Sequence, residues 1–192
     1  MQSIMDIKEI IRNNGGFLRT KNLTRRNHWY QLQKLMRTNE IVKLKNGLYC
    51  APTYGIAEQN REVAQIIPSG VFCLYSAWQR HGLTTQNPRQ YHIAVKREER
   101  ISAPDYPPVK IYRWSENFFN LGIMQDGNIK IYDLEKSVCD AVRFRNKVGI
   151  DIAIEVVKNY VKSENRNFDK LAKYASQMKI EKIMKNMIMP ML

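Results

Sequence analysis

Residues 27–50 have the sequence NHWYQLQKLMRTNEIVKLKNGLYC. Residues 27–38 place apolar side chains at helical spacing, and residues 41–50 form two short strand-like runs on either side of Asn46-Gly47. An Asn-Gly pair between two such runs is typical of a β-hairpin with a type I′ turn, because both central residues of that turn need a positive φ. The stretch therefore predicts a helix over residues 27–38 that is followed directly by a hairpin.

Two shorter helical segments are predicted upstream of this stretch. The first runs from about Ser3 to Arg12 and is ended by Gly15-Gly16, and the second lies around Leu23 with Thr20 as its N-cap. The apolar stripes expected to pack together are Ile4, Ile7, Ile10 and Ile11 of the first helix and Trp29, Leu32, Leu35 and Met36 of the third. Three helices followed by a hairpin predict a winged helix-turn-helix domain over residues 1–52, whose third helix enters the major groove of DNA.

Basic side chains are concentrated in this predicted domain. The chain has 31 Lys and Arg against 18 Asp and Glu, a net charge of +13. Residues 1–55 hold 10 of the basic and 3 of the acidic side chains, and thus +7 of that charge, on under a third of the length. A basic field favours polyanions, and neutralised phosphates supply most of the non-specific affinity for DNA. The alternative is a basic protein whose charge serves only solubility.

The polar face of the third helix and the hairpin supply the candidate contacts with double-stranded DNA. Hydrogen-bonding and cationic side chains of this kind reach both base edges and phosphates, and the sequence alone does not assign each residue to one or the other. The candidates are Arg25, Arg26, His28, Tyr30, Gln33, Lys34 and Arg37 of the helix and Lys43, Lys45 and Asn46 of the hairpin. Period-two alternation places Lys43 and Lys45 on the exposed side of the hairpin. The structural alternatives are an ordinary solvated helix face and an edge strand protected by its lysines.

A second domain is predicted over residues 56–192, after a candidate boundary at residues 52–55. It opens with helices over about residues 57–67 and 71–81, the latter capped by Ser69 and ended by Gly82. Strand-like runs follow at residues 91–95, 109–114, 122–125 and 129–132, and helical patterns occupy residues 134–147, 151–162, 169–178 and 181–189. Strands followed by helices predict an α+β fold.

Neither a membrane segment nor a disulfide framework is predicted. No uncharged apolar run approaches the ~18 residues that a membrane span needs, and charged residues interrupt the N-terminal apolar pattern, unlike in a secretory signal. Cys50, Cys73 and Cys139 are odd in number and scattered, without a Cys-x-x-Cys pair. They fit a reducing cytoplasm and indicate neither disulfides nor a zinc site. We expect a cytoplasmic protein without a metal ion or another cofactor.

Four stretches, in this order and at this spacing, are similar to those of a known family. They are Gly15-Gly16-Phe17-Leu18, residues 44–49 (LKNGLY), residues 91–95 (YHIAV) and residues 132–147 (YDLEKSVCDAVRFRNK). The last is the most specific, because a D-L-E-K-T/S-x-C-D run leads into a basic helix in the family. The chain thereby resembles the AbiEi antitoxins and transcriptional regulators of type IV bacterial toxin–antitoxin systems. The resemblance implies an N-terminal winged helix that binds the operon's own promoter, and a C-terminal domain that counters a cognate nucleotidyltransferase-like toxin.

One acidic cluster has a spacing that invites a catalytic interpretation. On a helix, Asp133 occupies the N-cap, Glu135 complements the dipole, and Lys136 and Asp140 form an i, i+4 surface pair, so capping and pairing explain the cluster without chemistry. A metal-dependent nuclease is the catalytic alternative and needs further carboxylates to converge there. Candidates for these are Asp105, Glu116 and Asp126. The histidines and cysteines form no recognisable catalytic arrangement, and we expect no enzyme.

Two basic clusters of the second domain are candidate contacts with DNA or with an acidic face of a toxin. They are Lys96, Arg97 and Arg100 in a turn and Arg143, Arg145 and Lys147 near the end of a helix. Cations at a helix C-terminus also stabilise the helix itself, so the second cluster has a structural explanation too. Three functions remain: a DNA-binding autorepressor and antitoxin, a winged-helix regulator that responds to a small ligand, and a basic nuclease.

Overall fold

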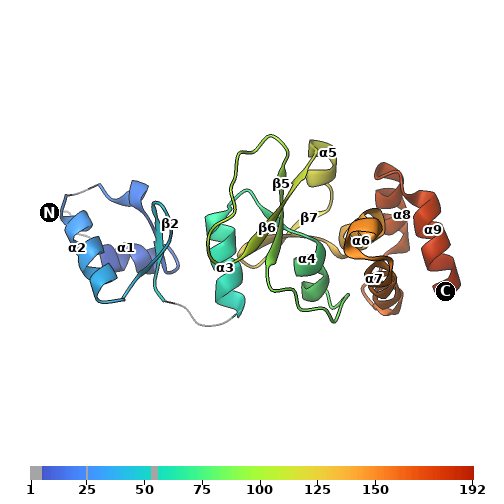
Figure 1. The fold of residues 1–192 in the computed structure, drawn as a ribbon, viewed down its shortest axis with the longest axis horizontal. Helices are drawn as coiled ribbons and strands as arrows, with labels where there is room; N and C mark the ends of the chain where they lie inside the picture. The colour runs from blue at the N-terminus through green and yellow to red at the C-terminus, as the bar shows by residue number, and fades with distance from the viewer. Residues whose placement is uncertain (1–5, 25, 53–55) are drawn as a thin grey trace. The chain divides into compact units, whose positions relative to one another are not determined.

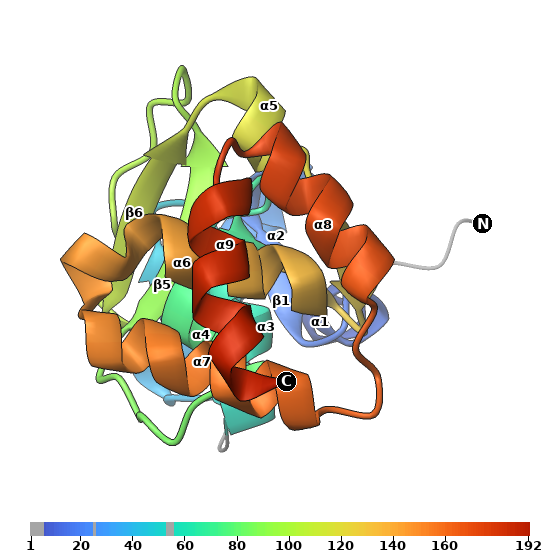
Figure 2. The same ribbon diagram turned by 90° about the vertical axis from the view of Figure 1, so that its right-hand side faces the viewer.

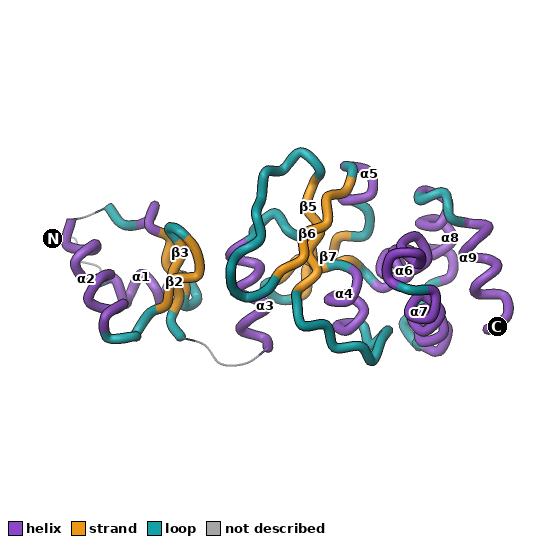
Figure 3. The backbone as a smooth tube through the Cα atoms, viewed as in Figure 1, coloured by secondary structure: helices purple, strands orange, loops and turns teal. Residues whose placement is uncertain are grey.

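The computed structural model describes residues 6–24, 26–52 and 56–192. The chain is an α+β protein that divides into two compact units, Met1–Ile66 and Ile67–Leu192, each with helices and a sheet of its own (Figure 1, Figure 3). The expected boundary at residues 52–55 lies mostly outside the described residues. The helix that follows it, α3 (Ile56–Ile66), is grouped with the first unit and not with the second.

The first unit combines helices with a small antiparallel sheet. Its elements are α1 (Ile7–Asn13), β1 (Phe17–Arg19), the 3₁₀ turn η1 (Thr20–Asn22), α2 (Arg26–Arg37), β2 (Val42–Lys45), β3 (Leu48–Cys50) and α3. The sheet has the order β1-β3-β2. The helix predicted over residues 27–38 and the hairpin after it are confirmed. The predicted second helix is wrong: η1 is a single 3₁₀ turn, because the Thr20 amide donates to the Gly47 carbonyl (2.9 Å) and Leu23 is already extended.

An apolar core joins α1, α2 and this sheet. Ile7, Ile10 and Ile11 are buried along one side of α1, as their spacing predicts. Leu32 and Leu35 of α2 belong to the same buried cluster. Each such side chain contributes about 1.5–3 kcal/mol to the unfolding free energy through its burial. The core therefore determines which face of α2 remains in solvent. Ile4 lies outside the described residues.

Two basic side chains of the small sheet reach the C-terminal end of α3. The Arg19 guanidinium donates to the backbone carbonyl of Gln65 (2.9 Å), and the Lys45 ammonium donates to the carbonyl of Ile66. The last carbonyls of a helix have no intrahelical partner and carry partial negative charge, so cations are favourable there. These bonds attach α3 to the first unit.

The second unit is built on a five-stranded mixed sheet. The strands are β4 (Val71–Phe72), β5 (Tyr91–Lys96), β6 (Val109–Trp114), β7 (Ile123–Asp126) and β8 (Ile129–Tyr132), in the order β6-β5-β4-β8-β7. The pairs β5–β6 and β4–β8 are parallel, whereas β4–β5 and β7–β8 are antiparallel. The strand-like runs at residues 91–95, 109–114, 122–125 and 129–132 are therefore confirmed as strands, to within one residue at their ends.

Helices cover the second unit's sheet in two layers. They are α4 (Leu74–Arg80), the short α5 (Glu116–Phe119), α6 (Leu134–Val148), α7 (Ile150–Lys162), α8 (Phe168–Gln177), α9 (Glu181–Ile188) and the 3₁₀ turn η2 (Met189–Met191). α6 and α7 lie between the sheet and the outer helices α8 and α9 (Figure 1), and Figure 2 shows α8 and α9 from their outer side. Trp78, Tyr132 and Tyr160 are fully buried between these layers. The core thus fixes α6 against the sheet.

The helix predicted over residues 71–81 is wrong in its first turn. Val71 and Phe72 form β4, the central strand, and the helix begins only at Leu74. β-Branched and aromatic side chains suit a pleated, buried position, and flanking strands on both sides satisfy the backbone there. Ser69 therefore caps no helix, and its hydroxyl hydrogen-bonds Glu99 instead. Gly82 ends α4 as predicted, with φ +67°.

Candidate nucleic-acid interface

The outward face of α2 combines cations, amides and aromatic rings without any carboxylate. Residues 26–37 contain no Asp or Glu. The exposed side chains of this helix are Arg26, Asn27, Trp29, Tyr30, Gln33, Lys34, Met36 and Arg37. The sequence candidates Arg26, Tyr30, Gln33, Lys34 and Arg37 are thereby brought together on one exposed helix surface. Arg25 lies outside the described residues.

One candidate of this helix, His28, is not on that surface. His28 is buried with Leu32 and Leu35, because residues at i, i+4 and i+7 lie within one narrow sector of a helix. Both of its ring nitrogens lack a hydrogen-bond partner among the described residues. The prediction that His28 contacts DNA is therefore wrong.

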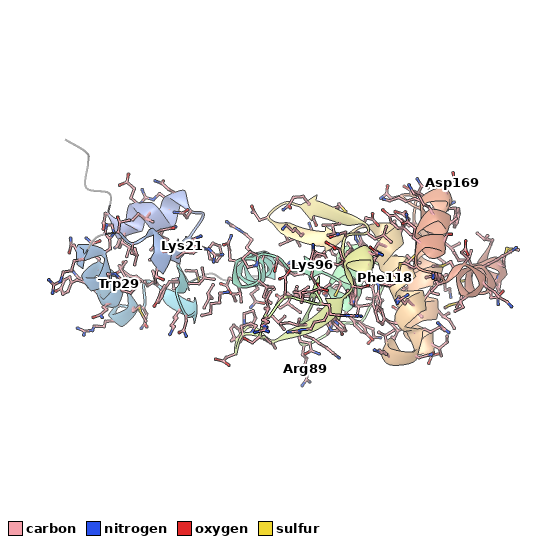
Figure 4. All side chains as sticks on the ribbon, turned by 90° about the horizontal axis from the view of Figure 1, so that it is seen from above. Lys21, Trp29, Arg89, Lys96, Phe118 and Asp169 are labelled. Carbon is pink, nitrogen blue, oxygen red and sulfur yellow. The ribbon has the colours of Figure 1, made fainter. Side chains whose placement is uncertain are left out.

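Trp29 is the residue of α2 that sequence reasoning missed. We expected it in the core with Leu32, but its side chain is 47% exposed, and Figure 4 shows it on the outer part of the first unit. The buried face of α2 contains His28 and not Trp29, so it is rotated by one residue relative to the predicted face. Met36 is also exposed and was misplaced for the same reason. An exposed Trp beside Tyr30, which is 72% exposed, adds aromatic surface to the polar one.

The hairpin presents one of its two lysines freely. Lys43, Lys45 and Asn46 are all exposed, but the Lys45 ammonium donates to the Ile66 carbonyl. Burial lowers the pKa of Lys45, and the nearby Arg19 adds to this. The predicted exposure of both lysines is therefore confirmed, while the Lys45 ammonium is occupied by α3.

The turn of the hairpin also differs from the predicted type I′. Gly47 has φ +77°, but Asn46 is not among the described residues with positive φ. The strand pairing shifts by one residue between Lys43 and Lys45, and this irregularity changes how the chain enters the turn. A Cβ at position 47 would lie 2.9 Å from the Thr20 hydroxyl and would make that side chain shift, so a substitution of Gly47 meets a contact as well as an unfavourable φ.

The acidic residue that follows α2, Glu40, is paired with a lysine. Glu40 accepts a hydrogen bond from the Lys8 ammonium at 2.6 Å. This bond, together with one from Thr38, lowers the pKa of Glu40. Because the pair is exposed, its contribution to stability is small. Its electrostatic consequence is that the Glu40 charge is partly compensated beside the basic helix.

The two basic clusters of the second unit meet at one small pocket. Arg97 and Arg143 line this cavity of about 170 Å³ together with Arg113, which the sequence analysis did not single out. The Arg143 guanidinium lies over the ring of Phe118, 3.9 Å from its centroid, and donates to the Met178 carbonyl. Side chains alternate between the two faces of a strand, and this alternation along β6 is the sequence signal that could have identified Arg113 as a surface residue.

Other members of these clusters have local partners. Lys96, labelled in Figure 4, forms a salt bridge with Glu116 at 2.7 Å. Arg145 donates to the Val142 carbonyl of its own helix, which supports the structural explanation for this residue. Arg100 and Lys147 are exposed, and Lys147 lines a second, larger pocket.

The acidic cluster at the start of α6 is occupied by internal contacts. Asp133 accepts the Lys136 amide (2.8 Å) as an N-cap, as predicted. Glu135 is buried and accepts the Asn167 amide (3.1 Å). Lys170 lies within salt-bridge distance of both carboxylates, at 3.1 and 3.2 Å. These contacts join α6 to α8 and explain the cluster structurally.

Lys136 and Asp140 do not form a surface pair, and that prediction is wrong. Their side chains are 0% and 1% exposed, with the ammonium 2.6 Å from the Asp140 carboxylate. The ammonium also lies 4.4 and 4.3 Å from the ring centroids of Trp114 and Tyr132. Burial raises the pKa of Asp140, and the Lys136 charge opposes this. The second carboxylate oxygen has no partner among the described residues.

The chain matches no protein-family model, and no curated protein is significantly similar to it. Within the described residues, no helix combines the length and the apolar character that crossing a membrane requires. No three side chains of His, Cys, Asp or Glu in that part of the chain are arranged to hold a metal ion. The three cysteines are buried and free.

Proposed function

We propose that the first unit is a winged helix-turn-helix domain that binds double-stranded DNA. Support comes from the element order, in which α1, β1 and η1 precede α2 and the hairpin follows it at once. In such domains the helix before the hairpin enters the major groove. The observation that carries the proposal is the acid-free outward face of α2, because phosphates attract its cations and base edges accept or donate to its polar groups.

The proposed division of labour follows from side-chain chemistry. Arg26, Gln33 and Arg37 are the types that form bidentate bonds with bases, whereas Lys34 and Lys43 suit phosphate oxygens. Tyr30 donates its hydroxyl to the DNA backbone. Removal of a base-reading side chain costs roughly 1–3 kcal/mol of binding free energy on the specific site only.

The biological role that we propose is that of a transcriptional autorepressor and antitoxin in the cytoplasm. The sequence resemblance described above supports this role and implies the promoter of the operon as the DNA site. It also implies a nucleotidyltransferase-like toxin as the partner. The second unit is then the toxin-facing part, with its arginine-lined pocket as one candidate contact.

DNA binding is tested by fluorescence anisotropy with the fragment upstream of the coding sequence and a scrambled fragment of equal length. The unaltered chain should bind the first more tightly. The variant Arg26→Glu/Lys34→Glu/Arg37→Glu should lose binding to both. The matched control reverses three exposed lysines of α7, α8 and α9, Lys158, Lys173 and Lys182, and changes the net charge equally. Retained operator binding by the α2 variant would refute the proposed interface.

A second candidate is a winged-helix regulator that responds to a small ligand and has no toxin partner. The larger pocket of the second unit, about 820 Å³, favours this candidate, since small-molecule sites commonly measure about 300–1,000 Å³. The two candidates differ in what changes DNA affinity: a toxin protein in the first and a pocket ligand in the second.

A further inference from the structure

The second unit contains a large pocket between its sheet and the C-terminal half of α6. The wall is formed by β5, β6, α4, the segment at residues 88–90 and α6. Its polar and aromatic lining includes Tyr75, Arg89, His92, Lys110, Tyr112 and Lys147. The pocket has a volume of about 820 Å³, and every residue around it belongs to the second unit. None of its lining residues belongs to the proposed DNA interface.

The charge of this pocket is entirely positive. Arg89, Lys110 and Lys147 contribute three cations, and none of the twelve described residues that line it is acidic. All three side chains are exposed; Figure 4 shows Arg89 extending from the surface. None of them takes part in the ion pairs of the described residues. A concave surface of one charge sign concentrates ions of the opposite sign, so an anionic group is favoured here.

The inner wall of the pocket is aromatic and held rigidly. The rings of His92 and Tyr112 are stacked, with centroids 5.5 Å apart, and the Tyr112 hydroxyl is 2.9 Å from His92 Nδ1. The Tyr75 ring lies 5.0 Å from that of His92, and its hydroxyl donates to the Val148 carbonyl. Burial lowers the pKa of His92 to about 4, so this ring is neutral at pH 7. His92 itself is buried, 4% exposed, and supports the partly exposed rings of Tyr75 and Tyr112, which offer flat, uncharged surface to a planar ligand.

We propose that this pocket binds a nucleotide, with its phosphates at Arg89, Lys110 and Lys147 and its base against Tyr75 and Tyr112, which His92 supports from behind. Inorganic phosphate would contact the three cations and leave the aromatic wall unused. An apolar ligand would contact the aromatic wall and leave the three cations without a partner. A nucleotide carries an anionic group and a planar ring on one scaffold. The site stands independently of the proposed DNA binding.

Binding is tested by isothermal titration calorimetry of the full chain with the four ribonucleoside 5′-monophosphates and triphosphates. The comparison ligands are the nucleosides, ribose 5-phosphate and inorganic phosphate. At least one nucleotide should bind about tenfold or more tightly than its nucleoside and than ribose 5-phosphate. Equal affinity for inorganic phosphate, or no saturable binding of any nucleotide, would overturn the proposal.

The lysines provide the variant test. Lys110→Ala/Lys147→Ala should weaken nucleotide binding about tenfold or more, whereas Lys158→Ala/Lys173→Ala, which removes two exposed lysines of α7 and α8, should leave it unchanged. The variant Arg26→Glu/Lys34→Glu/Arg37→Glu should also retain nucleotide binding, which separates this site from the DNA interface. Unchanged nucleotide affinity in Lys110→Ala/Lys147→Ala would exclude the pocket as the site.

A footprint on the unaltered chain keeps the proposal falsifiable if a variant fails to fold. The nucleotide should protect Lys110 and Lys147 from reductive methylation, whereas Lys158 should react equally with and without it. Protection by a short single-stranded oligonucleotide but by no mononucleotide would assign the surface to a nucleic-acid strand and overturn the nucleotide proposal.

Discussion

Trp29 and Leu32 lie three residues apart on α2, yet only the leucine is buried. Leu32 is 2% exposed and contacts the core formed with α1, whereas nearly half of the Trp29 side chain faces solvent. The difference matters because an exposed tryptophan on the proposed DNA-reading helix is available to a partner.

We expect Leu32→Ala to lower the unfolding free energy by about 2–5 kcal/mol, because it leaves a cavity in the small core of the first unit. Trp29→Ala should change it by less than about 1 kcal/mol, since little of its contact is lost. Urea denaturation followed by circular dichroism measures both. A larger loss for Trp29→Ala than for Leu32→Ala would contradict the assignment of the buried face.

Lys136 and Asp140 form a fully buried ion pair below the rings of Trp114 and Tyr132. We expect Lys136→Met to destabilise the chain by about 3–5 kcal/mol, because it leaves the Asp140 carboxylate buried without its partner. The double variant Lys136→Met/Asp140→Leu should recover most of the loss, since it removes both desolvated charges. Equal stability of the single and double variants in urea denaturation would show that the pair is not coupled.

His92 makes stability depend on pH. Its pKa is lowered from 6.5 to about 4, so between these values the unfolded chain binds a proton at this ring and the folded chain does not. The unfolding free energy should therefore fall as the pH falls from 6.5 to 4, by at most about 3 kcal/mol from this group. In His92→Asn the part of this pH dependence of the unfolding free energy that comes from the histidine ring should vanish. Urea denaturation at several pH values measures it, and parallel pH profiles for the two proteins would count against the prediction.

At the scale of elements, the hairpin and α2 present different chemistry. Lys43 is exposed on β2, while Lys45 is directed to the end of α3. The hairpin therefore offers one free ammonium and an amide, Asn46. Of these two elements, only α2 presents arginine and glutamine side chains.

We expect Lys43→Ala to weaken binding to operator and scrambled DNA by the same factor, and to reduce the slope of log affinity against log salt by about one. Lys45→Ala should have a smaller effect on the salt slope and a larger one on stability, because its ammonium is a partner of α3. Salt titrations by fluorescence anisotropy distinguish the two lysines. A stronger effect on the operator than on scrambled DNA would mean that Lys43 reads bases.

At the scale of the molecule, the chain divides into two compact units with separate cores. The proposed DNA contacts lie in the first unit, and both pockets lie in the second. Substitutions on the exposed surface of one unit are therefore expected to leave the other folded.

The proposed antitoxin role predicts that co-expression of this chain protects cells from the product of the neighbouring gene. The α2 charge-reversal variant should lose operator binding and still protect, because its changes lie in the first unit. Colony counts with and without induction measure protection. A neighbouring product that is harmless alone, or that stays toxic beside this chain, would leave the ligand-responsive regulator as the function. If Arg143→Ala/Arg145→Ala/Lys147→Ala still protects, these residues have no essential toxin contact.

Local patterns were sufficient to predict most elements of the chain. Side-chain periodicity predicts the helix over residues 27–38 and the strand over residues 109–114. The conformational freedom of glycine predicts the hairpin at Asn46-Gly47. The charge composition likewise indicated that residues 1–55 carry more than half of the net positive charge. These features depend on residues close together in sequence, so the sequence contains them.

Tertiary packing decided the rest, because burial depends on what distant segments place opposite a residue. His28 is inside and Trp29 outside because α1 covers one particular sector of α2. Val71 and Phe72 form a strand because β5 and β8 flank them. Lys136 is buried because Trp114 and Tyr132 enclose it. The pocket of Arg89, Lys110 and Lys147 gathers three segments that no local pattern relates. Contacts between such segments exist only in the folded chain.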